Sequence, residues 1–230
     1  MKLVLFDIDG TILWSDGAGR RAMTGALTTV FGTPGAPEYR YDGKTDPQIV
    51  HELMRGAGYE DQAIAARMAP LFACYVRLLE SELASHGDRV HVFEGVAELI
   101  DALEARSDAV VGLLTGNVAV GASLKLRAAG LDVARFRVGA YGSDSAHRPM
   151  LPAVAQRRAR EQLGLDLPGA DLVVIGDTPA DIECARVVGG AAIAVATGRY
   201  SVEALAAHAP KVVFPTLVDT DAVMRAIFDA

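Results

Sequence analysis

Two aspartates one residue apart follow an apolar run near the start of the chain. Asp7 and Asp9 come directly after residues 3–6, and an extended backbone sends both side chains to the same side. Two carboxylates so close repel each other unless a cation or a shared proton relieves them, so the pair indicates a bound metal or a raised pKa. Gly10 then lets the backbone turn sharply and approach a ligand. An Asx turn at the strand end would explain one aspartate and the glycine, but not both aspartates.

A second group of polar residues follows the apolar run at residues 110–114. Thr115, Gly116 and Asn117 place a hydroxyl and free backbone N–H groups at the start of a helix, where an anion can bind. An ordinary helix cap explains the same three residues, and taken alone it is the simpler interpretation.

A third group follows the apolar run at residues 172–175. Asp177 lies in the loop after this run, and Asp181 falls in the first turn of the next helix. Asp181 could merely complement the helix dipole, but Asp177 has no such explanation. Together with Asp7, Asp177 provides hard oxygen ligands from two strand ends, and such ligands suit Mg²⁺ with room for water and phosphate.

Strands and helices alternate through the stretches that carry these groups. The apolar runs predict strands over residues 3–6, 109–114, 136–139, 171–175, 191–196 and 212–214, and helices over residues 94–105, 120–129, 151–163, 179–188 and 217–228. This alternation predicts an α/β fold with a doubly wound, Rossmann-like and mostly parallel sheet. Ligands bind at the carboxyl ends of such strands, so the three polar groups should meet at one edge.

An all-helical stretch interrupts this pattern after the first strand. Helices are predicted over residues 15–30, 46–56 and 61–85, and Asp46 followed by Pro47 resembles an N-cap with proline at the first helical position. We therefore predict a core domain of residues 1–14 and 90–230 and an inserted helical cap domain of residues 15–89. The connections near residues 14–18 and 86–95 are expected to act as hinges.

Composition limits the partners and the compartment. The formal charge of −7 over 230 residues argues against a nucleic acid or an anionic membrane as partner. Cys74 and Cys184 lie among apolar residues and suit buried free thiols in a reducing compartment. Because Met1 and Lys2 lead directly into the first strand and no apolar run reaches transmembrane length, we expect a cytoplasmic protein. The sequence does not predict an oligomeric state.

The three polar groups together resemble the motifs of the haloacid dehalogenase-like phosphohydrolase superfamily. DIDGT at residues 7–11, an apolar run ending in Thr-Gly-Asn at residues 115–117, and GDTPAD at residues 176–181 match its first, second and fourth motifs in order. The resemblance covers residues 1–14 and 90–230. It implies phosphoryl transfer from a small phosphate ester through a covalent aspartyl-phosphate, with Mg²⁺ as cofactor.

The third motif of this superfamily is a single lysine or arginine upstream of the fourth. Arg148, in the run HRPMLP, stands at the matching place. Lys125 is the competing residue, and we interpret it as a solvated residue of the helix over residues 120–129.

The resemblance also implies a role for each motif residue. Asp7 would be the nucleophile, and Asp9 would be the general acid and base, which requires a raised pKa. Asp7, the backbone carbonyl of Asp9 and the Asp177 carboxylate would hold Mg²⁺, whereas Asp181 would act through a metal-bound water or orient Arg148. The expected phosphate contacts are Gly10, Thr115, Gly116, Asn117 and Arg148, with Thr115 and Arg148 also taking part in catalysis.

The helical insert resembles the cap of phosphoglycolate-phosphatase-like members. The turn at residues 43–46 is similar to the cap loop that reaches the site in that branch, so Lys44, with Arg20 or Arg21, could meet an anionic substrate. Solvated cations would look the same. A hexose-phosphate-type phosphomutase is an alternative, but its members commonly carry Glu where this chain has Gly176. A non-catalytic member that binds a phosphorylated ligand is another, and it would usually lack Asp7 or Asp9.

Overall fold

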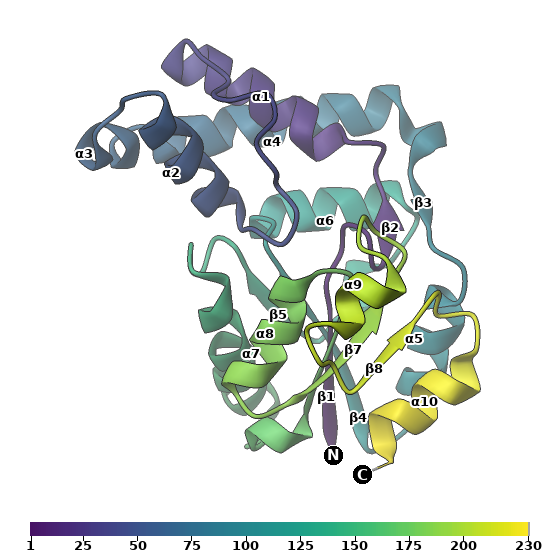
Figure 1. Ribbon diagram of the computed structural model, residues 1–230. Coiled ribbons are helices and arrows are strands. Elements are labelled where there is room, and N and C mark those ends of the chain that lie inside the picture. The colour runs from purple at the N-terminus through teal and green to yellow at the C-terminus, as the bar shows by residue number, and fades with distance from the viewer. Residues whose placement is uncertain (230) are drawn as a thin grey trace.

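The computed structural model describes residues 1–229, with an α/β layer and a layer of helices stacked above it (Figure 1). A six-stranded sheet in the order β5-β4-β1-β6-β7-β8 runs through the α/β layer, and every neighbouring pair is parallel. Its strands are β1 (Lys2–Phe6), β4 (Ala109–Thr115), β5 (Val138–Tyr141), β6 (Leu172–Gly176), β7 (Ala191–Val195) and β8 (Val212–Phe214). The predicted α/β fold with a parallel sheet is confirmed.

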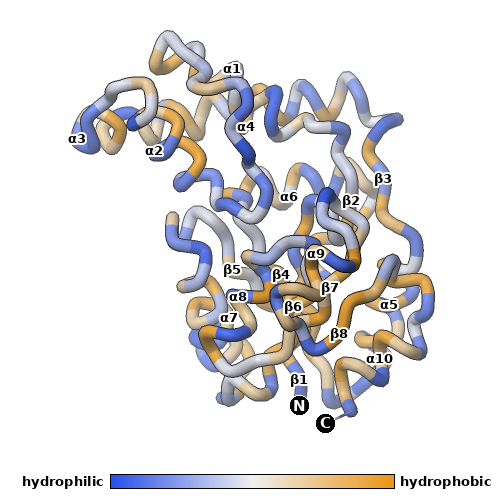
Figure 2. The backbone as a smooth tube through the Cα atoms, viewed as in Figure 1, coloured by the Kyte–Doolittle hydropathy of each residue, from blue (hydrophilic) through white to orange (hydrophobic). Residues whose placement is uncertain are grey.

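Strand β1 is central because both of its faces are apolar. Val4 and Phe6 pack into the core cluster on one face of the sheet, and Leu3 and Leu5 pack into the cluster on the other. The buried side chains of α5 (Val96–Glu104), α6 (Ala119–Ala128) and α10 (Thr220–Phe228) complete the first cluster. Those of α7 (Leu151–Leu163), α8 (Pro179–Val187) and α9 (Val202–Ala206) complete the second. Figure 2 shows the apolar chain concentrated along the strands of this layer.

Most predicted elements are present, with boundaries within three residues of the predicted ones. The strand predicted over residues 136–139 begins two residues late, at Val138, because residues 133–135 form a 3₁₀ turn that places the buried Phe136 ahead of the sheet. Helix α9 was not predicted, since its five residues are too few for a periodic pattern.

Four helices form the upper layer, which we call the helical unit (residues 18–85). They are α1 (Ala18–Phe31), α2 (Asp46–Gly56), α3 (Asp61–Ala65) and α4 (Met68–Ser85), and they enclose an apolar cluster of their own. The single helix predicted over residues 61–85 is wrong, because the chain breaks between α3 and α4. Pro70 lacks an N–H and fits only the first turn of a helix, so a new helix starts just before it. The predicted domain boundaries stay a prediction.

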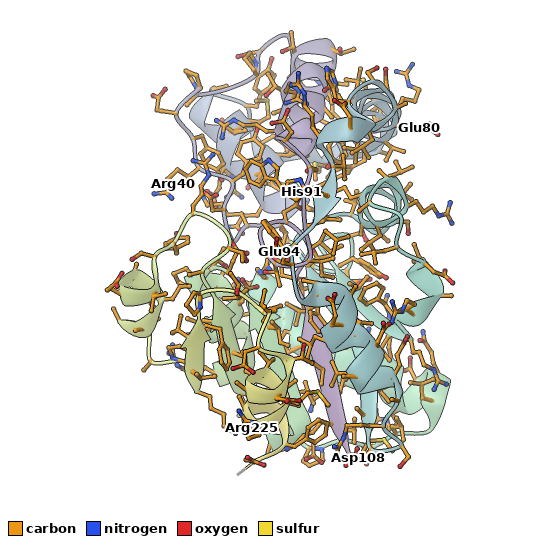
Figure 3. All side chains as sticks on the ribbon, turned by 90° about the vertical axis from the view of Figure 1, so that its right-hand side faces the viewer. Arg40, Glu80, His91, Glu94, Asp108 and Arg225 are labelled. Carbon is orange, nitrogen blue, oxygen red and sulfur yellow. The ribbon has the colours of Figure 1, made fainter. Side chains whose placement is uncertain are left out.

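A short antiparallel ribbon joins the two layers. Strands β2 (Leu13–Trp14) and β3 (His91–Val92) pair where the chain leaves the α/β layer and where it returns. Figure 3 labels His91 and Glu94 in this junction. Two-residue strands carry no alternation that a sequence pattern could reveal, so the ribbon was not predicted.

Cys74 and Cys184 are free and buried, as predicted. Among the described residues, no helix combines the length and the apolar composition that crossing a membrane would require.

Candidate active site

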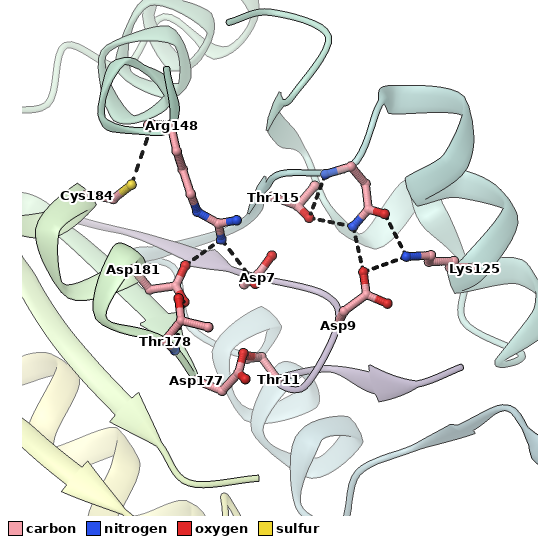
Figure 4. A network of polar contacts seen from close by, with 11 residues as sticks. Asp7, Asp9, Thr11, Thr115, Lys125, Arg148, Asp177, Thr178, Asp181 and Cys184 are labelled. Carbon is pink, nitrogen blue, oxygen red and sulfur yellow. Dashed lines mark hydrogen bonds and ion pairs between the residues drawn. The ribbon is translucent and has the colours of Figure 1, made fainter. Parts of the chain in front are cut away.

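Most of the predicted site residues meet at the carboxyl edge of the sheet, and Figure 4 shows Asp7, Asp9, Thr115, Arg148, Asp177 and Asp181 gathered there. The register pairs Phe6 with Leu113 on one side and with Ile175 on the other, so the residues after β1, β4 and β6 come together. A cavity of about 860 Å³ opens between this edge and the helical unit. The predicted residues in its lining are Asp7, Asp9, Gly10, Lys44, Thr115, Gly116, Asn117, Arg148 and Asp177. Asp181 lies buried beside the cavity.

Arg148 is buried between two of the aspartates. It begins the 3₁₀ turn that leads into α7, and its side chain is 4% exposed. The Nη2 atom lies 3.1 Å from Asp7 Oδ2 and 2.5 Å from Asp181 Oδ1. Among the described residues, the buried Nε atom has no hydrogen-bond partner. Asp181 is in position to orient Arg148, and this predicted role stays a prediction.

Asp7, Asp177 and Asp181 form a buried carboxylate cluster. One oxygen of each lies within 4.8 Å of the others. Burial raises the pKa of Asp7 to about 6. The positive charge of Arg148 opposes this rise, and the negative charge of Asp181 adds to it. Burial, Asp181 and Asp7 raise the pKa of Asp177 well above its usual range. Three crowded hard oxygen donors fit Mg²⁺, which would relieve their mutual repulsion.

This cluster differs from the predicted metal ligands at one residue. Asp181 belongs to it, and the carboxylate of Asp9 does not. The predicted contribution of Asp9 came from its backbone carbonyl, which stays a prediction.

Gly10 makes room for the cluster. Its φ of +85° lies in the left-handed region, and a Cβ there would come within 2.4 Å of Asp177 Oδ2. Thr11 Oγ1 donates a hydrogen bond to Asp177 Oδ1 at 3.1 Å. The turn after Asp9 therefore packs against Asp177 and fixes its position.

The Asp9 side chain is turned toward Lys125. Its Oδ2 accepts hydrogen bonds from Lys125 Nζ at 2.6 Å and from Asn117 Nδ2 at 2.8 Å. Burial by itself raises the pKa of Asp9. The charge and hydrogen bond of Lys125, with hydrogen bonds from Asn117 and Ser15, outweigh this effect and bring the pKa below its usual range. The raised pKa predicted for Asp9 is therefore wrong.

Lys125 is not the solvated residue that was predicted. Only 4% of it is exposed, and its ammonium pairs with Asp9 inside the site. Lys125 shares a helix face with the buried Ala122 and Leu126, but this helix separates apolar from polar residues so little that its pattern does not predict the burial.

The loop before α2 joins the helical unit to the α/β layer. Thr45, and not Asp46 as predicted, is the N-cap of α2, and its hydroxyl donates to Ala146 O at 2.8 Å. Asp46 N donates to Gly116 O at 2.8 Å, and Asp46 Oδ2 accepts from Val118 N at 2.8 Å. Asp46 therefore caps a helix of the other layer, and this loop forms one wall of the cavity.

Two of the three predicted substrate cations line the cavity. Lys44 Nζ lies 2.6 Å from Glu52 Oε2, so its charge is partly compensated. Arg20 lies over the Tyr41 ring at 4.6 Å. Arg21 pairs with Glu82 and is not in the cavity lining.

Comparison with known proteins gives one consistent result. Residues 4–186 match the family model of haloacid dehalogenase-like hydrolases. A phosphoglycolate phosphatase of Synechococcus elongatus is 29% identical over 217 residues, which are 91% of each chain. A hydrolase from Pseudomonas syringae has the same fold, with a TM-score of 0.75, 20% identity and 99% of each chain covered. CbbY from Rhodobacter sphaeroides, solved with phosphate, has a TM-score of 0.72 at 18% identity, with 95% of this chain and 96% of that one covered.

Proposed function

The chain belongs to the haloacid dehalogenase-like hydrolase family, and on this premise we propose that it is a Mg²⁺-dependent phosphatase of a small phosphate monoester. The observation that carries the proposal is the arrangement of Asp7, Arg148 and Asp177. A nucleophilic carboxylate, a buried cation and a second carboxylate share one end of the cavity. This set can attack a phosphoryl group and balance its negative charge.

The first step forms a phosphoryl-enzyme. A carboxylate oxygen of Asp7 attacks phosphorus, and the bond from phosphorus to the ester oxygen breaks. Arg148 stabilises the charge on the phosphoryl oxygens. Thr115 Oγ1 accepts from Asn117 Nδ2 at 2.8 Å, so its own proton is free to bind a phosphoryl oxygen. Bound Mg²⁺, held by the carboxylate cluster, would supply further charge neutralisation.

Asp9 transfers the proton in both steps. As an acid it protonates the leaving alkoxide, and as a base it then removes a proton from the water that attacks phosphorus and frees Asp7. Lys125 favours the ionised form of Asp9. A phosphoryl dianion next to Asp9 would raise the pKa of the Asp9 carboxyl, because like charges disfavour the ionised form.

One structural feature favours a hydrolase over the phosphomutase alternative. A Cβ on Gly176 would lie 2.2 Å from Asp181 Cγ and 2.5 Å from its Oδ2. The glutamate that mutase-type members commonly carry at this place would displace Asp181 and, with it, Arg148. The non-catalytic alternative is disfavoured because Asp7 and Asp9 are both present and both face the cavity.

The substrate we propose to test first is phosphoglycolate. Its support is the 29% identity to a phosphoglycolate phosphatase, together with Lys44 and Arg20 in the cavity lining. Phosphate release should be measured with a panel of phosphate esters that includes phosphoglycolate and hexose phosphates, with Mg²⁺ and after chelation. We expect Mg²⁺-dependent release from at least one small ester. Transfer of phosphate between positions of one sugar, with little release, would favour the mutase instead.

The metal assignment has a test that needs no substrate. We expect Mg²⁺ to raise the melting temperature of the protein, because it binds the folded carboxylate cluster and not the unfolded chain. The Asp177→Asn variant should lose most of this rise, whereas Asp166→Asn, at a side chain that is 87% exposed, should keep it. An equal rise in both variants would place the ion elsewhere.

A further inference from the structure

A buried lysine contacts the aspartate to which the proposed mechanism assigns proton transfer. The Lys125 ammonium lies 2.6 Å from Asp9 Oδ2 and 2.7 Å from Asn117 Oδ1 (Figure 4), and the Lys125 side chain is 5% exposed. Burying an ammonium is costly unless acceptors surround it, so this position needs a specific reason. No step of the proposed mechanism has used Lys125 directly.

The chemistry of the three side chains fixes how they are arranged. An ammonium can only donate hydrogen bonds, and an ionised carboxylate can only accept them. The amide of Asn117 must therefore turn Oδ1 to Lys125 and Nδ2 to Asp9 and Thr115, which is the orientation observed. Lys125 and Asn117 together form a closed triangle with one oxygen of Asp9.

The two oxygens of Asp9 are held very differently. Oδ2 accepts two hydrogen bonds of 2.6 and 2.8 Å, from Lys125 and Asn117. The hydrogen bond described for Oδ1 comes from Ser15 Oγ and is long, at 3.4 Å. The Asp9 side chain is 43% exposed and lines the cavity, so Oδ1 remains available to a substrate.

We propose that Lys125 is a positioning residue for the proton-transfer step. Together with Asn117 it holds Asp9 by Oδ2, so that Oδ1 exchanges the proton with the leaving alkoxide and then with water. The proposal rests on the proposed phosphatase function. Lys125 itself does not contact the phosphoryl group, and its contribution passes through the orientation of Asp9.

The helical unit completes this arrangement from above. A Cβ on Gly19, in the first turn of α1, would lie 3.0 Å from Lys125 Nζ and 3.4 Å from its Cε. The same atom would be 3.7 Å from the hydroxyl of Tyr75 on α4. The first turn of α1 therefore lies against the ammonium, and the Tyr75 hydroxyl lies close to the same place. The support of Asp9 thus depends on the helical unit lying where the structure has it.

The test compares two leaving groups in the Lys125→Met variant. An alkyl alkoxide needs a proton when it leaves, whereas p-nitrophenolate leaves without one, so general acid catalysis matters only for the first. We expect kcat/KM for an alkyl phosphate to fall about 100-fold and that for p-nitrophenyl phosphate by less than about threefold. KM for the alkyl ester should change little. Arg127→Met removes an exposed cation from the same helix and should leave both esters unchanged.

A double-mutant cycle separates positioning from a general structural role. If Lys125 acts through Asp9, then Lys125→Met should add little to the loss already caused by Asp9→Asn. Gly19→Ala, which pushes on the ammonium without removing it, should reduce alkyl ester turnover selectively and by a smaller factor. If Lys125→Met does not fold, Gly19→Ala takes its place in the comparison of the two leaving groups.

Three results would overturn the proposal. Equal losses for both esters, or losses that add to those of Asp9→Asn, would make Lys125 a structural residue only. Wild-type kcat/KM in the Lys125→Met variant would remove any role for it. A wild-type protein that hydrolyses no ester at all would instead refute the phosphatase assignment, and the wild-type assay alone distinguishes that case.

Discussion

The Asp7→Asn variant is expected to release phosphate at least roughly 10⁴-fold more slowly than the wild type, because an amide cannot replace the attacking carboxylate. Asparagine keeps the size of the side chain and can still accept a hydrogen bond from Arg148, which lies 3.1 Å from Asp7 Oδ2. The loss is measured as steady-state phosphate release with Mg²⁺ and the best ester of the panel. Asp166→Asn, the same chemical change at an exposed side chain, is the control and should be fully active.

A stability measurement distinguishes an inactive Asp7→Asn variant from an unfolded one. Burial raises the pKa of Asp7 from 3.8 to about 6 in the folded protein. The folded state therefore binds more protons than the unfolded chain between about pH 4 and pH 6, and stability falls as pH rises through this window. At pH 7.5, without metal, we expect Asp7→Asn to be more stable than wild type by about 1–3 kcal/mol in urea denaturation. Turnover close to wild type, or a less stable variant, would contradict this account of Asp7.

The strand ends could be predicted from the sequence because each signal is local. Residues 3–6, 110–114 and 172–175 are continuous apolar runs, and each is followed at once by polar residues. In a parallel sheet, chain order alone brings such ends to one edge. The structure accordingly places Asp7, Thr115 and Asp177 around one cavity.

The partners of these residues could not be predicted in the same way. Lys125 contacts Asp9 over 116 positions of sequence, and Asp46 contacts Val118 over 72. Neither contact follows from spacing, because it depends on how the helical unit sits on the sheet. A lysine within a helix and an aspartate beside a proline each have simpler local explanations, as a solvated residue and as an N-cap. Those explanations were wrong because the packing between layers decides these contacts.

Cavity charge is likewise a property of packing. The sequence indicates Lys44 as a cation for an anionic substrate, but the fold places it 2.6 Å from Glu52. The Lys44 charge is therefore partly compensated, and Arg20 is held over an aromatic ring. The electrostatic field in the part of the cavity beside the helical unit depends on these pairs. The substrate therefore has to be identified with the ester panel.

The Arg148→Met variant is expected to lose turnover and stability together. Arg148 is the cation in contact with two members of the carboxylate cluster, and it bonds Asp181 at 2.5 Å. Without it, the phosphoryl charge loses a buried donor, and we expect turnover to fall by roughly 10²–10³-fold. Three buried carboxylates would remain without a compensating arginine, so the metal-free protein should lose about 3–5 kcal/mol of stability. Arg157→Met, at an exposed arginine of α7, is the control for both measurements.

Mg²⁺ should distinguish a lost charge from a lost contact in this variant. A dication in the carboxylate cluster supplies the charge that Arg148 no longer provides, so Mg²⁺ should raise the melting temperature of Arg148→Met more than that of wild type. It should not restore turnover, because the ion cannot replace the guanidinium N–H groups that we propose bind the phosphoryl oxygens. Arg148→Lys keeps a positive charge and should recover part of the turnover and part of the stability. If Arg148→Met instead keeps wild-type turnover, another cation serves the phosphoryl group, and Lys125, the competing buried cation, becomes the residue to replace next.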